Sequence, residues 1–133
     1  MNRPAISFLL VAGILCTGTA EVTETQTEAS VTVTKLTDKL YTSTCTGGRE
    51  FNLPLYSTNL VASVGEDGIL LVDAGFGETG QALRDTLAAL GDGQLKLIIS
   101  THYHGDHTFG NQFLKNQATI MGHHSAVSRM SGD

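Results

Sequence analysis

The stretch LKLIISTHYHGDH, residues 95–107, joins an apolar run to a cluster of ionisable side chains. Residues 95–99 are nearly all apolar, which is typical of a central strand buried on both faces of a sheet. The loop that follows carries four potential metal ligands within six residues, in a chain with only five histidines: His102, His104, Asp106 and His107. The stretch therefore predicts a buried strand that ends at a metal-binding loop.

The spacing of these ligands suits a divalent cation. In an extended segment alternate side chains point the same way, so His102 and His104 can bind one ion together. Gly105 permits a sharp turn, after which Asp106 and His107 can face a second position. Imidazole and carboxylate ligands suit zinc, at about 2.0–2.2 Å, and also admit iron or manganese. The alternative is a polar loop with Asp106 as the N-cap of a following helix, which leaves the histidines unexplained.

The chain before this stretch predicts a hairpin and then a helix. Residues 60–64 and 69–72 are apolar and β-branched, and the glycine-containing segment 65–68 between them is typical of a tight turn. A change of period follows, with leucines at helical spacing and a glycine just past the end: Leu83, Leu87, Leu90 and Gly91. Strand, helix and strand in succession predict a parallel βαβ unit with a right-handed crossover.

Two polar groups follow the strands of this unit. Asp73 ends one strand and His102 follows the other. Ligands in open α/β sheets gather at the carboxyl ends of parallel strands, so both groups are expected at one edge of the sheet. An alternative for Asp73 is a simple turn-forming role at the strand end.

Shorter elements complete the expected fold. Alternation over residues 31–34 and apolar residues up to Tyr41 indicate one or two opening strands. A short helix is expected over residues 110–116, and another strand over 118–121. Cys45 lies in a Thr/Gly-rich stretch with no activating base nearby in the sequence, and we interpret it as an incidental thiol.

The N-terminus has the pattern of a signal peptide over residues 1–20. Arg3 precedes an apolar run over residues 5–16, and the small residues before position 21 favour cleavage after Ala20. The run is shorter than the roughly 20 residues that span a bilayer, and Leu15 before Cys16 disfavours a lipid anchor, so no stable membrane anchor is expected. We expect an exported protein, periplasmic or secreted; the alternative is a buried N-terminal strand or helix.

Composition limits the remaining possibilities. The 133 residues allow one domain at most, and 41% hydrophobic and 16% charged residues are typical of a globular chain. After the signal peptide we expect a flexible leader over residues 21–30 and a folded part over residues 31–133. The net charge of −5 disfavours nucleic acid as a partner. We expect a small-molecule substrate, and the oligomeric state stays open. Cleavage leaves Cys45 as the single cysteine, so no internal disulfide is expected.

The His-x-His-x-Asp-His pattern after an apolar strand resembles the signature of the metallo-β-lactamase superfamily. The sequence LVDAG, residues 71–75, is similar to an earlier motif of the same superfamily. The resemblance implies an α/β (α+β) fold, the αββα sandwich of metallo-β-lactamases, of which this sequence supplies the N-terminal half.

The resemblance also implies roles for individual residues. His102 and His104 would bind a first metal, and Asp106 and His107 a second, with two zinc ions in a complete site. Asp73 would orient the ligands. Asp106 would be catalytic, because it would position the metal-bound hydroxide that attacks an ester, lactam or phosphodiester.

Other expected features separate this chain from a complete enzyme. Relatives use further metal ligands, which are a histidine, a bridging carboxylate and a final histidine, and residues after His107 do not supply them. His123 and His124 follow a strand where some relatives have a histidine at the pocket edge; the alternative for them is a surface or capping role. We therefore expect a truncated product, inactive alone, with an exposed apolar sheet face. Alternative functions are a non-catalytic metal-binding fragment and an iron-dependent oxidoreductase resembling the sulfur dioxygenases.

Overall fold

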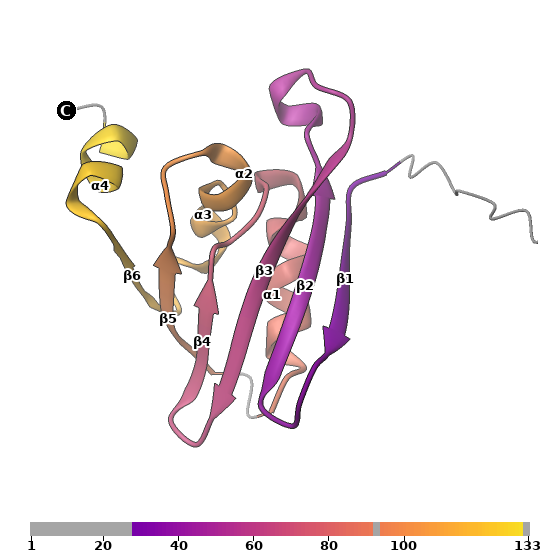
Figure 1. The fold of residues 1–133 in the computed structure, drawn as a ribbon, viewed down its shortest axis with the longest axis vertical. Coiled ribbons are helices and arrows are strands. Elements are labelled where there is room, and N and C mark those ends of the chain that lie inside the picture. The colour runs from indigo at the N-terminus through magenta and orange to yellow at the C-terminus, as the bar shows by residue number, and fades with distance from the viewer. Residues whose placement is uncertain (1–27, 92–93, 132–133) are drawn as a thin grey trace, which may run out of the picture.

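The computed structural model describes residues 28–91 and 94–131, which form a six-stranded sheet with helices. The strands follow chain order across the sheet (Figure 1): β1 Ser30–Lys35, β2 Leu40–Gly47, β3 Tyr56–Gly65, β4 Gly68–Val72, β5 Leu95–Ser100 and β6 Thr119–Gly122. The α-helices are α1 Gly80–Ala88, α2 Gly105–Thr108, α3 Asn111–Leu114 and α4 His124–Ser131. Two short 3-10 helices, η1 Arg49–Phe51 and η2 Gly77–Thr79, lie in the loops after β2 and β4.

Strand direction divides the sheet into two parts. Strands β1 to β4 pair antiparallel, and β4, β5 and β6 pair parallel. The expected hairpin is confirmed, since Gly65 pairs with Gly68, whose φ of 119° is the left-handed conformation that glycine tolerates. The expected βαβ unit is also confirmed, with α1 between β4 and β5. As a result, the carboxyl ends of β4, β5 and β6 share one edge of the sheet.

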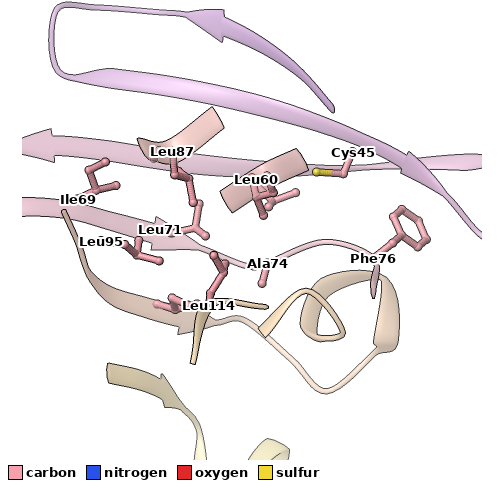
Figure 2. Close-up of a cluster of buried hydrophobic side chains, with 12 residues drawn as sticks. Cys45, Leu60, Ile69, Leu71, Ala74, Phe76, Leu87, Leu95 and Leu114 are labelled. Atoms are coloured by element: carbon pink, nitrogen blue, oxygen red, sulfur yellow. The ribbon is translucent and has the colours of Figure 1, made fainter. Parts of the chain in front are cut away.

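The hydrophobic core lies between the sheet and the helices. Leu83 and Leu87 from α1 and Leu114 from α3 are buried in one cluster with Leu71 and Ile98 of the central strands. Figure 2 shows Leu71, Leu87 and Leu114 of this cluster. The leucine spacing that predicted α1 thus describes the side of the helix that faces the sheet. The helix ends three residues before Gly91, which has a φ of 52°.

Cys45 belongs to this core. It lies in β2 with its side chain fully buried beside the turn at Gly75 (Figure 2), so the Thr/Gly-rich stretch around it is a strand. Burial raises the pKa of the Cys45 thiol to about 11, although a hydrogen bond with Thr79 opposes that shift. A protonated thiol inside the core is consistent with the absence of a nucleophilic role.

The expectation that β5 is buried on both faces is wrong. Ile98 is fully buried, whereas the next residue, Ile99, is 37% exposed. Ile99 stands in register with Val61, Val72 and Met121 of the neighbouring strands, and we call these four residues the open face. Helices α1 and α3 pack on the opposite face, and no described element lies over the open face (Figure 1).

The expected signal peptide, residues 1–20, lies outside the described residues. Residues 21–27 of the expected leader also lie outside them. Ser30, which the sequence assigned to the leader, is the first residue of β1. Within residues 28–91 and 94–131, no helix is both long enough and apolar enough to cross a membrane.

Candidate metal-binding site

Two loops meet at the carboxyl edge of the parallel strands. The loop after β4 and the loop after β5 are joined by backbone hydrogen bonds from Ala74 N to His107 O, at 2.8 Å, and from Gly110 N to Gly75 O, at 3.0 Å. A Cβ atom at Gly110 would overlap the carbonyl oxygen of Ala74, so glycine permits this close approach. The two loops therefore form one backbone unit that fixes the side chains they carry.

Asp73 connects the two loops through its side chain. Its φ of 62° turns the chain at the end of β4, and its carboxylate is nearly fully buried. That carboxylate accepts hydrogen bonds from Thr101 N and Thr101 Oγ1, each at 2.8 Å, and lies 2.9 Å from His107 Nδ1. Asp73 is thus a turn residue and also the group that orients the imidazole of His107.

The structure brings the sequence-predicted ligands together. The ring of His102 lies 4.7 Å from that of His104 and 4.3 Å from that of His107, measured between centroids. Asp106 joins the same cluster, because its Oδ2 lies 3.4 Å from His107 Nε2. Three imidazoles and a carboxylate from one loop therefore form a compact donor cluster.

The donor atoms of the cluster do not converge on one point. Within the described part of the chain, no three His, Cys, Asp or Glu side chains are arranged to hold an ion as they stand. His107 faces Asp73 and Asp106, while His102 Nδ1 lies 3.0 Å from Thr101 Oγ1. The donor chemistry suits zinc, whereas the side-chain positions would have to adjust before three donors shared one ion.

The alternative interpretation of Asp106 as a helix N-cap is wrong. Helix α2 begins at Gly105, its N-cap is His104, and no side chain caps it. Asp106 lies within the first turn, where a carboxylate is favourable near the positive end of the helix. The hydroxyl of Thr108 instead donates to His104 O at 2.9 Å, which fixes the backbone between the two halves of the motif.

Two further residues of the site were missed by sequence analysis. Thr58, buried in β3, places its Oγ1 3.2 Å from His107 Nε2. Tyr56, on the same strand, packs edge-on against Phe76 with ring centroids 5.0 Å apart, and its pKa is raised by desolvation and by the charges of Asp106 and Glu50. Both precede the motif by about fifty positions, and no local pattern singles them out.

His124 is the first residue of α4 and His123 precedes it, and their rings are 4.1 Å apart. His123 Nδ1 accepts a hydrogen bond from Ser125 N at 3.3 Å, which is a capping contact. His123 also lines an open hollow of about 350 Å³ to which His102 contributes. His123 therefore makes a capping contact and also lies at the edge of the candidate site. His124 does not line the hollow.

Comparisons with known proteins agree with this fold. The sequence profile of the metallo-beta-lactamase superfamily matches residues 54–131, more than half of the chain. The metallo-beta-lactamase from Pontibacter korlensis aligns with a TM-score of 0.69 at 17% identity, over 78% of this chain and 48% of that protein. The FIM-1 enzyme of Pseudomonas aeruginosa, in its mono-zinc form, aligns with a TM-score of 0.60 at 20% identity, over 77% and 46%.

A third solved structure, the metallo-beta-lactamase from Hirschia baltica, aligns with a TM-score of 0.60 at 20% identity, over 77% of this chain and 47% of that protein. The chain thus spans about half the length of the solved structures it matches. No curated protein matches it. Profile, fold and the placement of the histidine loop at the carboxyl edge agree: the chain belongs to the metallo-β-lactamase superfamily.

Proposed function

We propose that this chain carries the first part of the metal site of an exported, metal-dependent hydrolase. The observation that supports this most directly is the donor cluster itself. His102, His104, Asp106 and His107 lie together at the carboxyl edge of the parallel strands, beside the buried carboxylate of Asp73. A polar loop with only a structural role has no need for three neighbouring imidazoles.

Zinc is the proposed metal, with iron or manganese also compatible with the donors. His102 and His104 would hold one ion, and Asp106 and His107 would hold another. A bound divalent cation would supply Lewis acidity and lower the pKa of water to about 7. Asp73 would orient His107 by accepting a hydrogen bond from its Nδ1, which would leave Nε2 to bind a metal. The Asp106 carboxylate would help to orient the attacking water.

The proposed reaction is hydrolysis of an ester, a lactam or a phosphodiester. Because the chain spans about half of the solved structures it matches, we propose that it is inactive until further ligands complete the site. A second candidate is a non-catalytic metal-binding module. It is compatible with the neighbouring imidazoles of His102 and His104, which could bind one ion without the further ligands that hydrolysis requires.

Zinc uptake tests the proposal. The full chain, freed of metal and then titrated with Zn²⁺, is expected to bind the ion, and binding should be lost in the double variant His102→Ala plus His104→Ala. The matched control is His123→Ala plus His124→Ala, which removes the other two histidines and should leave uptake unchanged. Equal uptake by the wild type and the motif variant would reject the site.

Metal content and colour separate zinc from iron and thus separate the hydrolase from an oxidoreductase. The coding DNA downstream of the Asp133 codon supplies the next test. If it encodes the further ligands, the longer product is expected to hydrolyse substrate in the presence of zinc and to lose activity on His102→Ala. If that longer product binds zinc without hydrolysis, the non-catalytic module is the better description.

A further inference from the structure

A hollow beside the donor cluster has a charge opposite to that of the chain. It lies between the loop after β5 and helix α4, has a volume of about 350 Å³, and is lined by Thr101, His102, Tyr103, His123, Ser125 and Arg129 among others. Among residues 28–91 and 94–131, no carboxylate lines it, although acidic residues outnumber Lys and Arg by 13 to 8 in the sequence. Arg129 therefore supplies a fixed positive charge that no acidic side chain of the described residues neutralises.

Arg129 is oriented by an aromatic ring. Its guanidinium carbon lies 4.9 Å from the ring centroid of Tyr103, and it forms no ion pair with an acidic side chain within residues 28–91 and 94–131. A guanidinium that stacks on a ring uses its face, so the N–H groups along its edge stay available. Tyr103 stands between His102 and His104, which ties the position of the guanidinium to the donor cluster.

The same pair of residues borders a second hollow of about 370 Å³, whose lining is part polar and part apolar. Phe109 and Met130 line this hollow together with Tyr103 and Arg129, and both are exposed large hydrophobic residues. Apolar surface beside an unpaired guanidinium is the combination that recognises an organic anion, whose charged group and hydrocarbon body need different surroundings.

We propose that Arg129 binds the oxyanionic group of the substrate, a carboxylate, sulfate or phosphate, next to His102. The planar guanidinium matches two oxygens of such a group through parallel N–H···O bonds. The inference rests on the proposed hydrolase function and narrows its substrates to organic anions, with the body of the molecule against Tyr103, Phe109 and Met130. Arg129 would then determine specificity, and the donor cluster would act on the bond placed near His102.

Anion binding can be measured apart from metal binding. We would remove metal from the ¹⁵N-labelled full chain with EDTA, dialyse the chelator away, and titrate with inorganic phosphate and separately with acetate at pH 8, where an ordinary imidazole is neutral. Saturable shifts are expected at the Arg129 side chain and at the amides of Ser125 and His102. Arg129→Gln removes the charge and keeps a polar side chain of similar helix propensity, and it should weaken binding by at least about tenfold.

Arg84→Gln is the matched control. Arg84 is also a partly exposed arginine on a helix, lies near Asp85, and does not line either hollow, so its loss should leave the shifts unchanged. Binding of either anion that is lost with Arg129 supports the proposal. Binding of neither, or equal binding by Arg129→Gln, overturns it. Because EDTA removes metal, this result is independent of the zinc titration, so the two proposals can fail separately.

Discussion

The two faces of the sheet use the same strands in different ways. Leu71 of β4 and Ile98 of β5 are fully buried on one face. Their chain neighbours on the other face differ, since Leu70 is only partly buried and Ile99 is 37% exposed. All four are large aliphatic residues, so composition does not distinguish the faces. What distinguishes them is the layer on top: α1 and α3 cover the first face, and no described element covers the open face.

The difference shows that an apolar run indicates a strand that can pack against a layer on each face. Whether each face is buried depends on whether that layer is present. Strands that face a layer on each side have apolar residues at successive positions, and β5 has this pattern although one of its faces is open. An exposed row of aliphatic side chains is an unfavourable surface in water and a site for association.

The largest contrast is expected from truncating neighbouring leucines of β4. Leu71→Ala should lower the free energy of unfolding by about 3–5 kcal/mol, because it leaves a cavity under α1. Leu70→Ala, the matched control on the other face, should cost about 1 kcal/mol, because the partly exposed site loses less buried surface. Urea denaturation measures both. Equal losses would mean that both faces are covered in solution.

The second contrast concerns thiol reactivity, measured in a Cys16→Ser background. Because the pKa of Cys45 is about 11 against an ordinary 9.0, its thiolate fraction at pH 8 is about a hundredfold lower, and alkylation should be slower by at least that factor. The comparison is Thr44→Cys with Cys45→Ala, which moves the thiol one residue along β2. Alkylation of Cys45 should be half-maximal near pH 11, whereas that of the moved thiol should be half-maximal near pH 9. Similar rates at pH 8 would contradict the buried position.

The buried thiol also links stability to pH. Since the folded-state pKa lies above the unfolded value, Cys45 favours folding below pH 9 and loses that contribution as the pH rises toward about 11.

The smallest effect on stability is expected on the open face. Ile99→Thr keeps a β-branched residue in the strand and should change the free energy of unfolding by less than about 1 kcal/mol. It should also lower the fluorescence of a dye that binds exposed apolar surface. Ile98→Thr is the counterpart, because it buries a hydroxyl in the core and should destabilise the protein by about 2 kcal/mol or more. Unchanged dye fluorescence in Ile99→Thr would mean that the row is covered.

Local sequence signals predicted the elements that depend on neighbouring residues. The turn between β3 and β4 followed from its glycines, and α1 followed from its leucine spacing. Strand β2 was harder, since a run of threonines and glycine around Cys45 has little apolar periodicity, and its pairing with β1 and β3 decides its structure. The exposure of Ile99 depends on whether a layer packs over the open face, and the local sequence pattern does not predict this.

The donor residues of the site were predicted because one short loop carries them all. Their surroundings were not, because Thr58 reaches His107 from a strand 49 positions earlier in the chain. The same holds for Arg129, whose contact with Tyr103 depends on where α4 lies relative to the loop after β5. The sequence thus predicts the chemistry of the site, and the tertiary structure determines the shape around it.

The backbone hydrogen bonds between the loops after β4 and β5 have a consequence for motion. The amides of Ala74 and Gly110 lie outside regular strands, yet each is bonded across to the other loop. Their hydrogen exchange is therefore expected to be slow and to occur in a single opening event that also releases Asp73 from His107. We therefore expect the loop that carries the histidines and the turn at Asp73 to open together.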